Sequence, residues 1–168
     1  MSISATLRRV QTEYAAGQDR PLKGYLAAMS TFAGAVGLAT AVGRHLGVRL
    51  PERFALGDVA LVSVATYKAS RLATKGSVTS ALRAPFTRYE EPAGNAEVNE
   101  SVRGDGVRHA VGELVTCPFC SGVWIAGALV GGLVFAPRAT RLVATALTAI
   151  AASDVLHIAV HRLDSTSD

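Results

Sequence analysis

The chain has 168 residues, of which 49% are hydrophobic and 6% aromatic, and its 17 Lys and Arg outnumber 13 Asp and Glu. The apolar residues are gathered in long uncharged blocks, which excludes an ordinary soluble domain of this length. No basic run is dense enough, or sufficiently interleaved with aromatic residues, to form a nucleic-acid surface, so we expect no nucleic-acid partner.

Four segments have the length of membrane-spanning helices: residues 25–43, 54–72, 115–136 and 142–160. About 18 uncharged residues suffice to cross roughly 30 Å of hydrocarbon as a helix. Residues 1–24 form a polar or amphipathic tail, which is too long to be the charged leader of a cleaved signal peptide. The sequence therefore predicts an all-α integral membrane protein surrounded by lipid. Residues 25–168 form its single membrane domain, with a tight hairpin at residues 137–141.

The second predicted span differs from the others because it contains charges. Asp58 lies near its start, and Lys68 and Arg71 lie near its end. An ionisable side chain within lipid costs several kcal/mol unless it is paired or reaches the interface. Two interpretations stay open. Lys68 and Arg71 either extend their charged ends to the membrane surface, or they pair with a group such as Asp154 or bind an anion.

Polar residues dominate the segment between the second and third spans, residues 73–114. Pro85, Pro92 and several glycines interrupt it, and its apolar residues are too few for a core of its own. We expect a short amphipathic helix within residues 78–89 and a mobile stretch at residues 90–108. The acidic residues of this segment are interpreted as a solvated surface; they are Glu90, Glu91, Glu97 and Glu100.

The distribution of basic residues predicts the orientation of the four spans. Of the 17 Lys and Arg residues, twelve fall on the side that holds both termini and the long loop. The five on the opposite side are Arg44, Arg49, Arg53, Arg138 and Arg141. Because basic residues concentrate in the cytoplasm, we expect a multi-pass inner (plasma) membrane protein with both termini and the long loop in the cytoplasm.

The two cysteines of the chain lie at the start of the third predicted span, in the segment Thr116-Cys117-Pro118-Phe119-Cys120. The cytoplasm keeps thiols reduced, so we do not expect a structural disulfide. Thr116 is suited to cap the helix, Pro118 is tolerated in a first turn, and the helix dipole favours a thiolate. A redox dithiol, a metal-ligand pair, an acylation site and plain packing stay open as interpretations.

Helical spacing places Cys117, Cys120, Trp124, Gly127 and Gly131 on one face of the third span. The two glycines are four residues apart, which is typical of membrane helices that pack closely. We therefore expect the cysteines to face another helix rather than lipid.

Two histidines on the fourth span, His157 and His161, are four residues apart and share a face with Asp154. Counted from the hairpin near Ala139, they lie at nearly the same depth as the two cysteines. Two thiolates and two imidazoles form a suitable tetrahedral shell for zinc. The sequence therefore predicts a candidate zinc site formed by Cys117, Cys120, His157 and His161.

The segment Gly112–Trp124 resembles the signature of a family of small bacterial multi-span membrane proteins catalogued only as a domain of unknown function. Lys68–Leu72 and Val78–Thr87 also resemble that family's pattern, and the similarity extends from about Phe54 to the end of the chain. The resemblance implies a bacterial multi-span membrane protein. It brings no activity, substrate or catalytic residue.

Two functions remain open at the level of sequence. The first is a small bacterial membrane protein whose cytoplasm-facing cysteine pair binds a metal or acts as a thiol site. The second is a structural or assembly subunit that packs against a membrane-protein partner or another copy through small-residue helix faces. No nucleophile and base pair is visible beyond the cysteines, so the sequence does not establish an enzyme.

Overall fold

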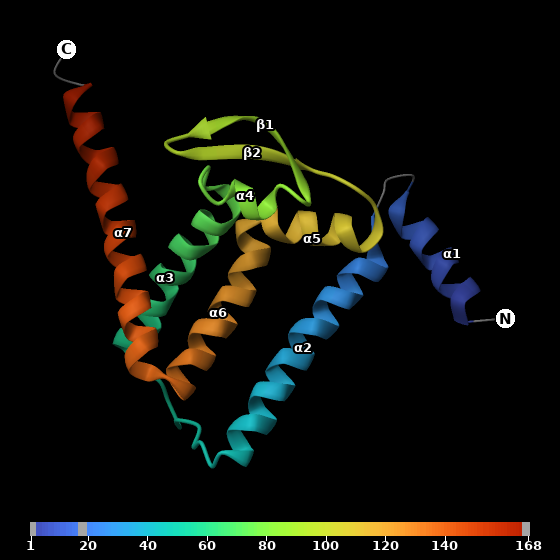
Figure 1. The fold of residues 1–168 in the computed structure, drawn as a ribbon, viewed down its shortest axis with the longest axis horizontal. Coiled ribbons are helices and arrows are strands. Elements are labelled where there is room, and N and C mark those ends of the chain that lie inside the picture. Colours follow the sequence, from blue (N-terminus) through green and yellow to red (C-terminus); the bar gives the residue numbers. More distant parts are fainter. Residues whose placement is uncertain (1–2, 17–19, 166–168) are drawn as a thin grey trace.

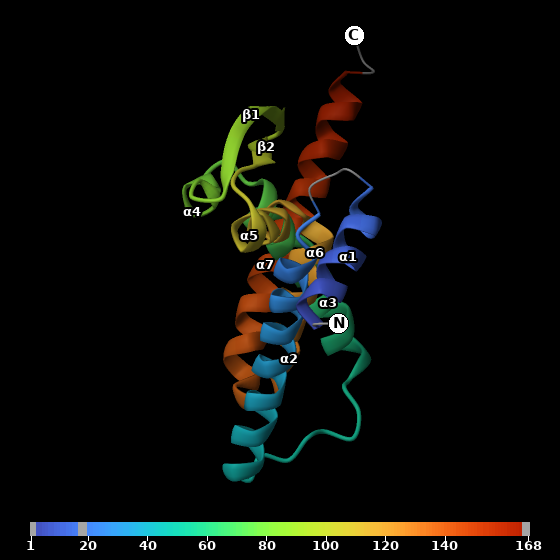
Figure 2. The ribbon, with the colours of Figure 1, turned by 90° about the vertical axis from the view of Figure 1, so that its right-hand side faces the viewer.

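The computed structural model describes residues 3–16 and 20–165. The elements of this part are, in chain order, α1 (Ile3–Ala15), α2 (Leu22–His45), α3 (Leu56–Lys75), α4 (Ser80–Arg83), β1 (Thr87–Gly94), β2 (Glu97–Val102), α5 (Gly106–Thr116), α6 (Pro118–Phe135) and α7 (Pro137–Asp164). The long helices α2, α3, α6 and α7 run in alternating directions, and the elements from α4 to α5 form a cap across one end (Figure 1). Figure 2 shows the long helices in a narrow layer, with α7 reaching past the cap.

Three helices are long and apolar enough to cross a membrane: α2, α6 and α7. Few of their residues are buried inside the protein, so their apolar surface faces outward, as lipid requires. The fourth long helix, α3, has 20 residues but carries Asp58, Lys68, Arg71 and Lys75. The structure is therefore mostly helical, with three helices that could span a membrane and a charged one of similar length.

Helix α3 is the centre of the bundle. It packs on both α6 and α7, and each of these helices contacts α3 more extensively than it contacts the other. Ala65 of α3 and Ala144 of α7 are completely buried, which is consistent with the close approach that small residues permit between membrane helices. Toward the cap, α6 and α7 are therefore separated by α3, which crosses behind α7 and lies between the two helices at that end in Figure 1.

The turn between α6 and α7 is shorter than predicted. Residues 137–141 were expected to form it, but α7 begins at Pro137 and a single residue, Ala136, separates the two helices. A proline is favoured at the first helical position because its missing N–H would have no partner there. The proline therefore starts the second helix of the hairpin and does not prolong the turn.

The expected all-α fold is found only in part, because part of the segment expected to be mobile, residues 90–108, forms strands. Strands β1 and β2 form an antiparallel hairpin in which Thr87 lies opposite Val102 and Gly94 lies opposite Glu97. The turn is possible because Gly94 and Ala96 both adopt positive φ values, 110° and 59°. The strands lack a strong apolar alternation, so their order depends on contacts with α3, α4 and α5.

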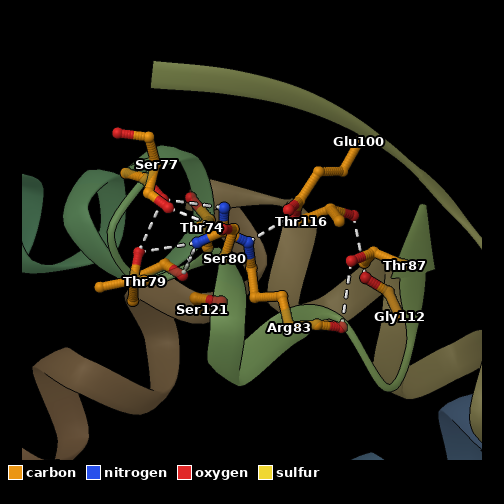
Figure 3. A network of polar contacts seen from close by, with 12 residues as sticks. Thr74, Ser77, Thr79, Ser80, Arg83, Thr87, Glu100, Gly112, Thr116 and Ser121 are labelled. Atoms are coloured by element: carbon orange, nitrogen blue, oxygen red, sulfur yellow. Dashed lines mark hydrogen bonds and ion pairs between the residues drawn. The ribbon is translucent and has the colours of Figure 1, made fainter. Parts of the chain in front are cut away.

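Arg83 of α4 provides the most extensive of these contacts, as Figure 3 shows. Its side chain is only 2% exposed and its Nε donates to Glu100 Oε2 of β2 at 2.6 Å. Its Nη1 donates to Ala73 O and to Thr79 Oγ1, both at 2.8 Å, and its Nη2 donates to Gly76 O at 3.0 Å. One guanidinium thus joins the end of α3, the loop after it and the hairpin.

The acidic residues of the cap are not all the solvated surface that was expected. Glu100 is 4% exposed in its ion pair with Arg83. Glu97 accepts two hydrogen bonds from Arg71 of α3, at 2.9 Å and 2.5 Å. A carboxylate is buried in a protein only when it is paired, and these two are paired with arginines from other elements.

Gly112 of α5 provides a test of the cap packing. A Cβ at this position would lie 2.4 Å from Val102 Cγ1 and 3.0 Å from Phe86 O. We expect Gly112→Ala to lower the free energy of unfolding by about 1–3 kcal/mol, because neither neighbour can move freely. Thermal unfolding in detergent measures the effect. Gly131→Ala is the matched control, since a Cβ there meets nothing within 4 Å, and equal stability of the two variants would contradict this packing.

Candidate functional site: a cleft with a cysteine pair

The site begins with a break between α5 and α6 at Cys117. Pro118 disfavours the helical conformation in the residue before it, and Cys117 is accordingly extended, with φ −100° and ψ 110°. Helix α5 therefore ends at Thr116, and α6 begins at Pro118. As a result α5 lies across the end of the bundle while α6 runs along it (Figure 1).

Cys117 itself caps α6. Its Sγ accepts a hydrogen bond from the backbone N–H of Cys120 at 3.2 Å. Thr116, which the sequence assigned to the cap, instead donates from Oγ1 to Gly112 O at 2.9 Å within α5. Both cysteines are free thiols, with Cys117 half-buried and Cys120 exposed.

The surroundings of Cys117 stabilise its thiolate. Burial raises the pKa of the Cys117 thiol, but hydrogen bonds from Cys120 and from the backbone of Phe119 outweigh burial and leave the pKa below its usual value. The positive charge of Lys75 acts in the same direction. This is the environment in which a cysteine becomes a nucleophile.

We expect this lowered pKa to appear as an alkylation profile for Cys117 with its midpoint below that of a free cysteine. The measurement is the rate of reaction with iodoacetamide against pH in Cys120→Ser, where Cys117 is the sole thiol and a hydroxyl donor is retained. Cys120→Ala removes the side-chain donor, so its midpoint should move to higher pH. Identical profiles in the two variants would show that the Cys120 side chain does not stabilise the thiolate.

The cysteines line a cleft of about 820 Å³ between α2, α5 and α6. Most of its lining is apolar, including Met29 and Phe32 of α2 and Trp124 of α6. The rings of Phe32 and Trp124 meet edge to face, with centroids 5.1 Å apart. Gly127 allows this contact, because a Cβ there would be 3.2 Å from the Phe32 ring. Trp124 and Gly127 therefore pack α6 on α2, whereas no atom of another described residue lies within 4 Å of a Cβ placed at Gly131.

A polar group closes the other end of the cleft. Glu113 of α5 accepts a hydrogen bond from the hydroxyl of Tyr25 and lies 3.5 Å from Arg20 Nη1. The Nε2 atom of His109 is 3.7 Å from the same carboxylate. These side chains could not be identified from the sequence, because Tyr25 and Glu113 are 88 residues apart. The one available signal was the position of Glu113 inside the segment that resembles a family signature.

The predicted four-residue zinc site is not assembled. The described residues contain no group of three or more His, Cys, Asp or Glu side chains that could hold a metal ion. The cysteines face the cleft beside α2, whereas His157 and His161 are exposed on α7. The depth comparison assumed that α6 and α7 lie side by side, but α3 lies between them.

Three of the four charged residues of α3 pair with side chains on neighbouring elements. Lys68 Nζ donates to Asp154 of α7, and Arg71 binds Glu97 of the hairpin. At the opposite end of α3, Asp58 accepts two hydrogen bonds from Arg141, at 2.8 Å and 2.7 Å. Pairing offsets much of the cost of placing charged groups near lipid. These contacts therefore allow α3 to lie among apolar helices.

Comparison with known proteins places more than half of the chain in a family. Residues 61–160 match the family model described as Protein of unknown function (DUF1360). Over 86 residues the chain is 34% identical to Sporulation protein YjcA of Bacillus subtilis (strain 168), a match that covers 49% of this chain and 73% of that protein. No solved structure matches the chain. The matched region holds both cysteines, the cap and most of α3 and α7, and the resemblance noted in the sequence is confirmed. The chain belongs to the DUF1360 family of proteins of unknown function.

Proposed function

We propose that this protein is a four-span bacterial inner-membrane protein whose Cys117–Cys120 pair is a reversible thiol site at the cytoplasmic surface. The observation that carries the proposal is the Cys117 Sγ atom. It accepts the Cys120 N–H at the start of α6, has a lowered pKa and borders a cleft large enough for a substrate.

The direction of the helices supports four spans. Helices α2 and α6 run the same way in Figure 1, so a chain that crosses the membrane through α2 must cross back through α3 before entering α6. The ion pairs of Asp58 and Lys68 lower the cost of that crossing. Basic residues are fewer at the end opposite the cap, which supports a cytoplasmic location of the cap and both termini.

The chemistry that this pair supports is thiol–disulfide exchange. The Cys117 thiolate attacks one sulfur of a disulfide, forms a mixed disulfide and releases the other sulfur as a thiolate that takes up a proton. The Cys120 thiol then loses its proton and attacks Cys117, which releases the second thiol. The pair ends as a Cys117–Cys120 disulfide, and the substrate disulfide has gained two electrons and two protons.

Equilibration of the full chain in detergent with glutathione buffers of graded potential tests the proposal. We expect one sharp two-electron transition, read by alkylation of the remaining thiols and mass spectrometry. Cys120→Ser should stop at a mixed disulfide between Cys117 and glutathione, and Cys117→Ser should react more slowly. Thiols that stay reduced at every potential would overturn the proposed function.

A structural or assembly subunit is the second candidate. One family member is named a sporulation protein, so a membrane-linked role in spore formation is the setting to test. Replacement of the chromosomal gene by a Cys117→Ser/Cys120→Ser version separates the candidates. If this strain forms spores normally while the complete deletion is defective in spore formation, the result would support the structural subunit and contradict the thiol site.

A further inference from the structure

We propose that the oxidant of the Cys117–Cys120 pair is a membrane quinone, which enters the cleft between α2 and α6 from the lipid. The inference rests on the proposed thiol function and names the substrate class of that site. The carrying observation is that one cleft combines two thiols, an apolar wall with two aromatic rings and a polar end.

The walls of the cleft match a lipid-soluble molecule better than a soluble one. Its volume of about 820 Å³ is in the range of small-molecule sites. Met29 lies on the membrane-facing part of α2, is 68% exposed and lines the cleft, so the opening faces the apolar surroundings of the bundle. A quinone already resides in the bilayer, so it can enter this apolar cleft without leaving water.

The arrangement of rings and polar groups matches the two parts of a quinone. In the apolar part of the cleft, the rings of Phe32 and Trp124 can contact the planar ring of a quinone through an edge or a face. At the polar end, the Tyr25 hydroxyl donates its one proton to Glu113, and Arg20 contacts the same carboxylate through Nη1, which leaves its other N–H groups as donors. A quinone oxygen needs a hydrogen-bond donor when its negative charge develops, and Arg20 lines the same cleft as the thiols.

The reaction balances without a further reactant. The Cys117 thiolate forms a bond to a ring carbon of the quinone, and the Cys120 thiolate then attacks Cys117 Sγ. The sulfur–carbon bond breaks, its electron pair passes to the ring, and the two sulfurs are joined as a disulfide. The two thiol protons end on the two quinone oxygens, so the quinone becomes a hydroquinone. Through this step the protein would read the redox state of the quinone pool.

Trp124 is the single tryptophan of the chain and provides a direct readout of binding. In the full-length Cys117→Ser/Cys120→Ser variant, which cannot react, a benzoquinone with a decyl chain should quench Trp124 fluorescence with saturation. Adding Ala33→Phe, which fills the cleft from α2, should abolish the saturation. Ala35→Phe is the matched control, because Ala35 is exposed on the same helix and does not line the cleft.

Anaerobic oxidation of the protein with intact cysteines by the same quinone completes the test. We expect one hydroquinone per disulfide formed and a rate at least about tenfold lower in Ala33→Phe, since the cleft holds the quinone beside the thiols. The rate with oxidised glutathione should be the same in Ala35→Phe and the unchanged protein, and the same rate measured in Ala33→Phe corrects its quinone rate for any change in thiol reactivity.

Three outcomes would overturn the inference. Quenching that rises linearly, or equally in Ala33→Phe, would show that the quinone only dissolves in the detergent. Quenching of Trp124 by a brominated phospholipid that the quinone cannot displace would make the cleft a lipid site. Thiols that react reversibly with glutathione but not with the quinone would contradict the quinone as oxidant and remain consistent with the proposed function. Thiols that react with neither would contradict the proposed function itself.

Discussion

Arg83→Met is expected to lower the free energy of unfolding by about 3–5 kcal/mol, because it removes one partner of a buried ion pair. The side chains of Arg83 and Glu100 are 2% and 4% exposed, so the carboxylate would be left without a counter-charge and without water. The carbonyl groups of Ala73 and Gly76 would lose a donor in the same change. The cap should then separate from the end of α3.

Two further variants distinguish the ion pair from simple packing. Arg83→Lys keeps the charge but has only three N–H donors on one nitrogen for the four acceptors that Arg83 reaches, so we expect a loss smaller than that of Arg83→Met. Arg83→Met/Glu100→Leu removes both charges and should recover part of the stability. Hydrogen exchange of the cap in detergent measures each effect.

The control for this series is Arg9→Met, which breaks the exposed pair of Arg9 and Glu13 in α1. An exposed pair contributes about 0–1 kcal/mol, so this variant should behave like the unchanged protein. If Arg83→Met were as stable as Arg9→Met, the buried network would have no part in holding the cap.

The second large effect is expected at Lys68, whose side chain is 15% exposed and pairs with Asp154 of α7. Lys68→Met leaves a carboxylate beside lipid without a partner, which costs about 2–3 kcal/mol or forces the carboxylate to take up a proton. We expect less folded protein in the membrane, measured by size-exclusion chromatography of a fluorescent fusion. The pairing of α3 with α7 should be the contact that weakens.

The charge exchange Lys68→Asp/Asp154→Lys tests this explanation. It restores opposite charges across the same two helices, so most of the folded protein should return. Recovery in Lys68→Met/Asp154→Met as well would show that removing the unpaired charge is sufficient. A Lys68→Met protein that folds as well as the unchanged one would show that α3 tolerates the lone carboxylate.

The three apolar helices could be predicted because each is encoded by a continuous apolar block. Residues 25–43, 115–136 and 142–160 lie within or close to α2, α6 and α7. The ends of these helices depend on single residues. Pro137 was assigned to a turn but begins a helix, and Thr116 was assigned to a cap that the neighbouring Cys117 provides.

The cap could not be predicted because its order depends on pairs that are distant in sequence. Its strands have little apolar alternation, and the paired residues Arg83 and Glu100 are 17 positions apart in the sequence. A local pattern cannot show which acidic residue meets which arginine. The carboxylates were therefore interpreted as solvated, although Glu100 is among the most buried charged groups of the described chain.

The cysteine pair was identified from its spacing, but its surroundings were not. Counting residues along two helices gives depth only, and the predicted zinc site needed α6 and α7 to be direct neighbours. The insertion of α3 between them and the position of α2 beside the cysteines are properties of the packed bundle. The cleft, with Tyr25 and Glu113 at its polar end, follows from that packing.

The central claim is a reactive thiol pair on the cytoplasmic side of a membrane protein. The most direct test is labelling of the two native cysteines with a membrane-impermeant maleimide in vesicles of known orientation. We expect rapid labelling of Cys117 and Cys120 in inside-out vesicles and none in right-side-out vesicles, with Cys117→Ser/Cys120→Ser as the blank. Labelling from the outer face, or no labelling in either orientation, would contradict the account.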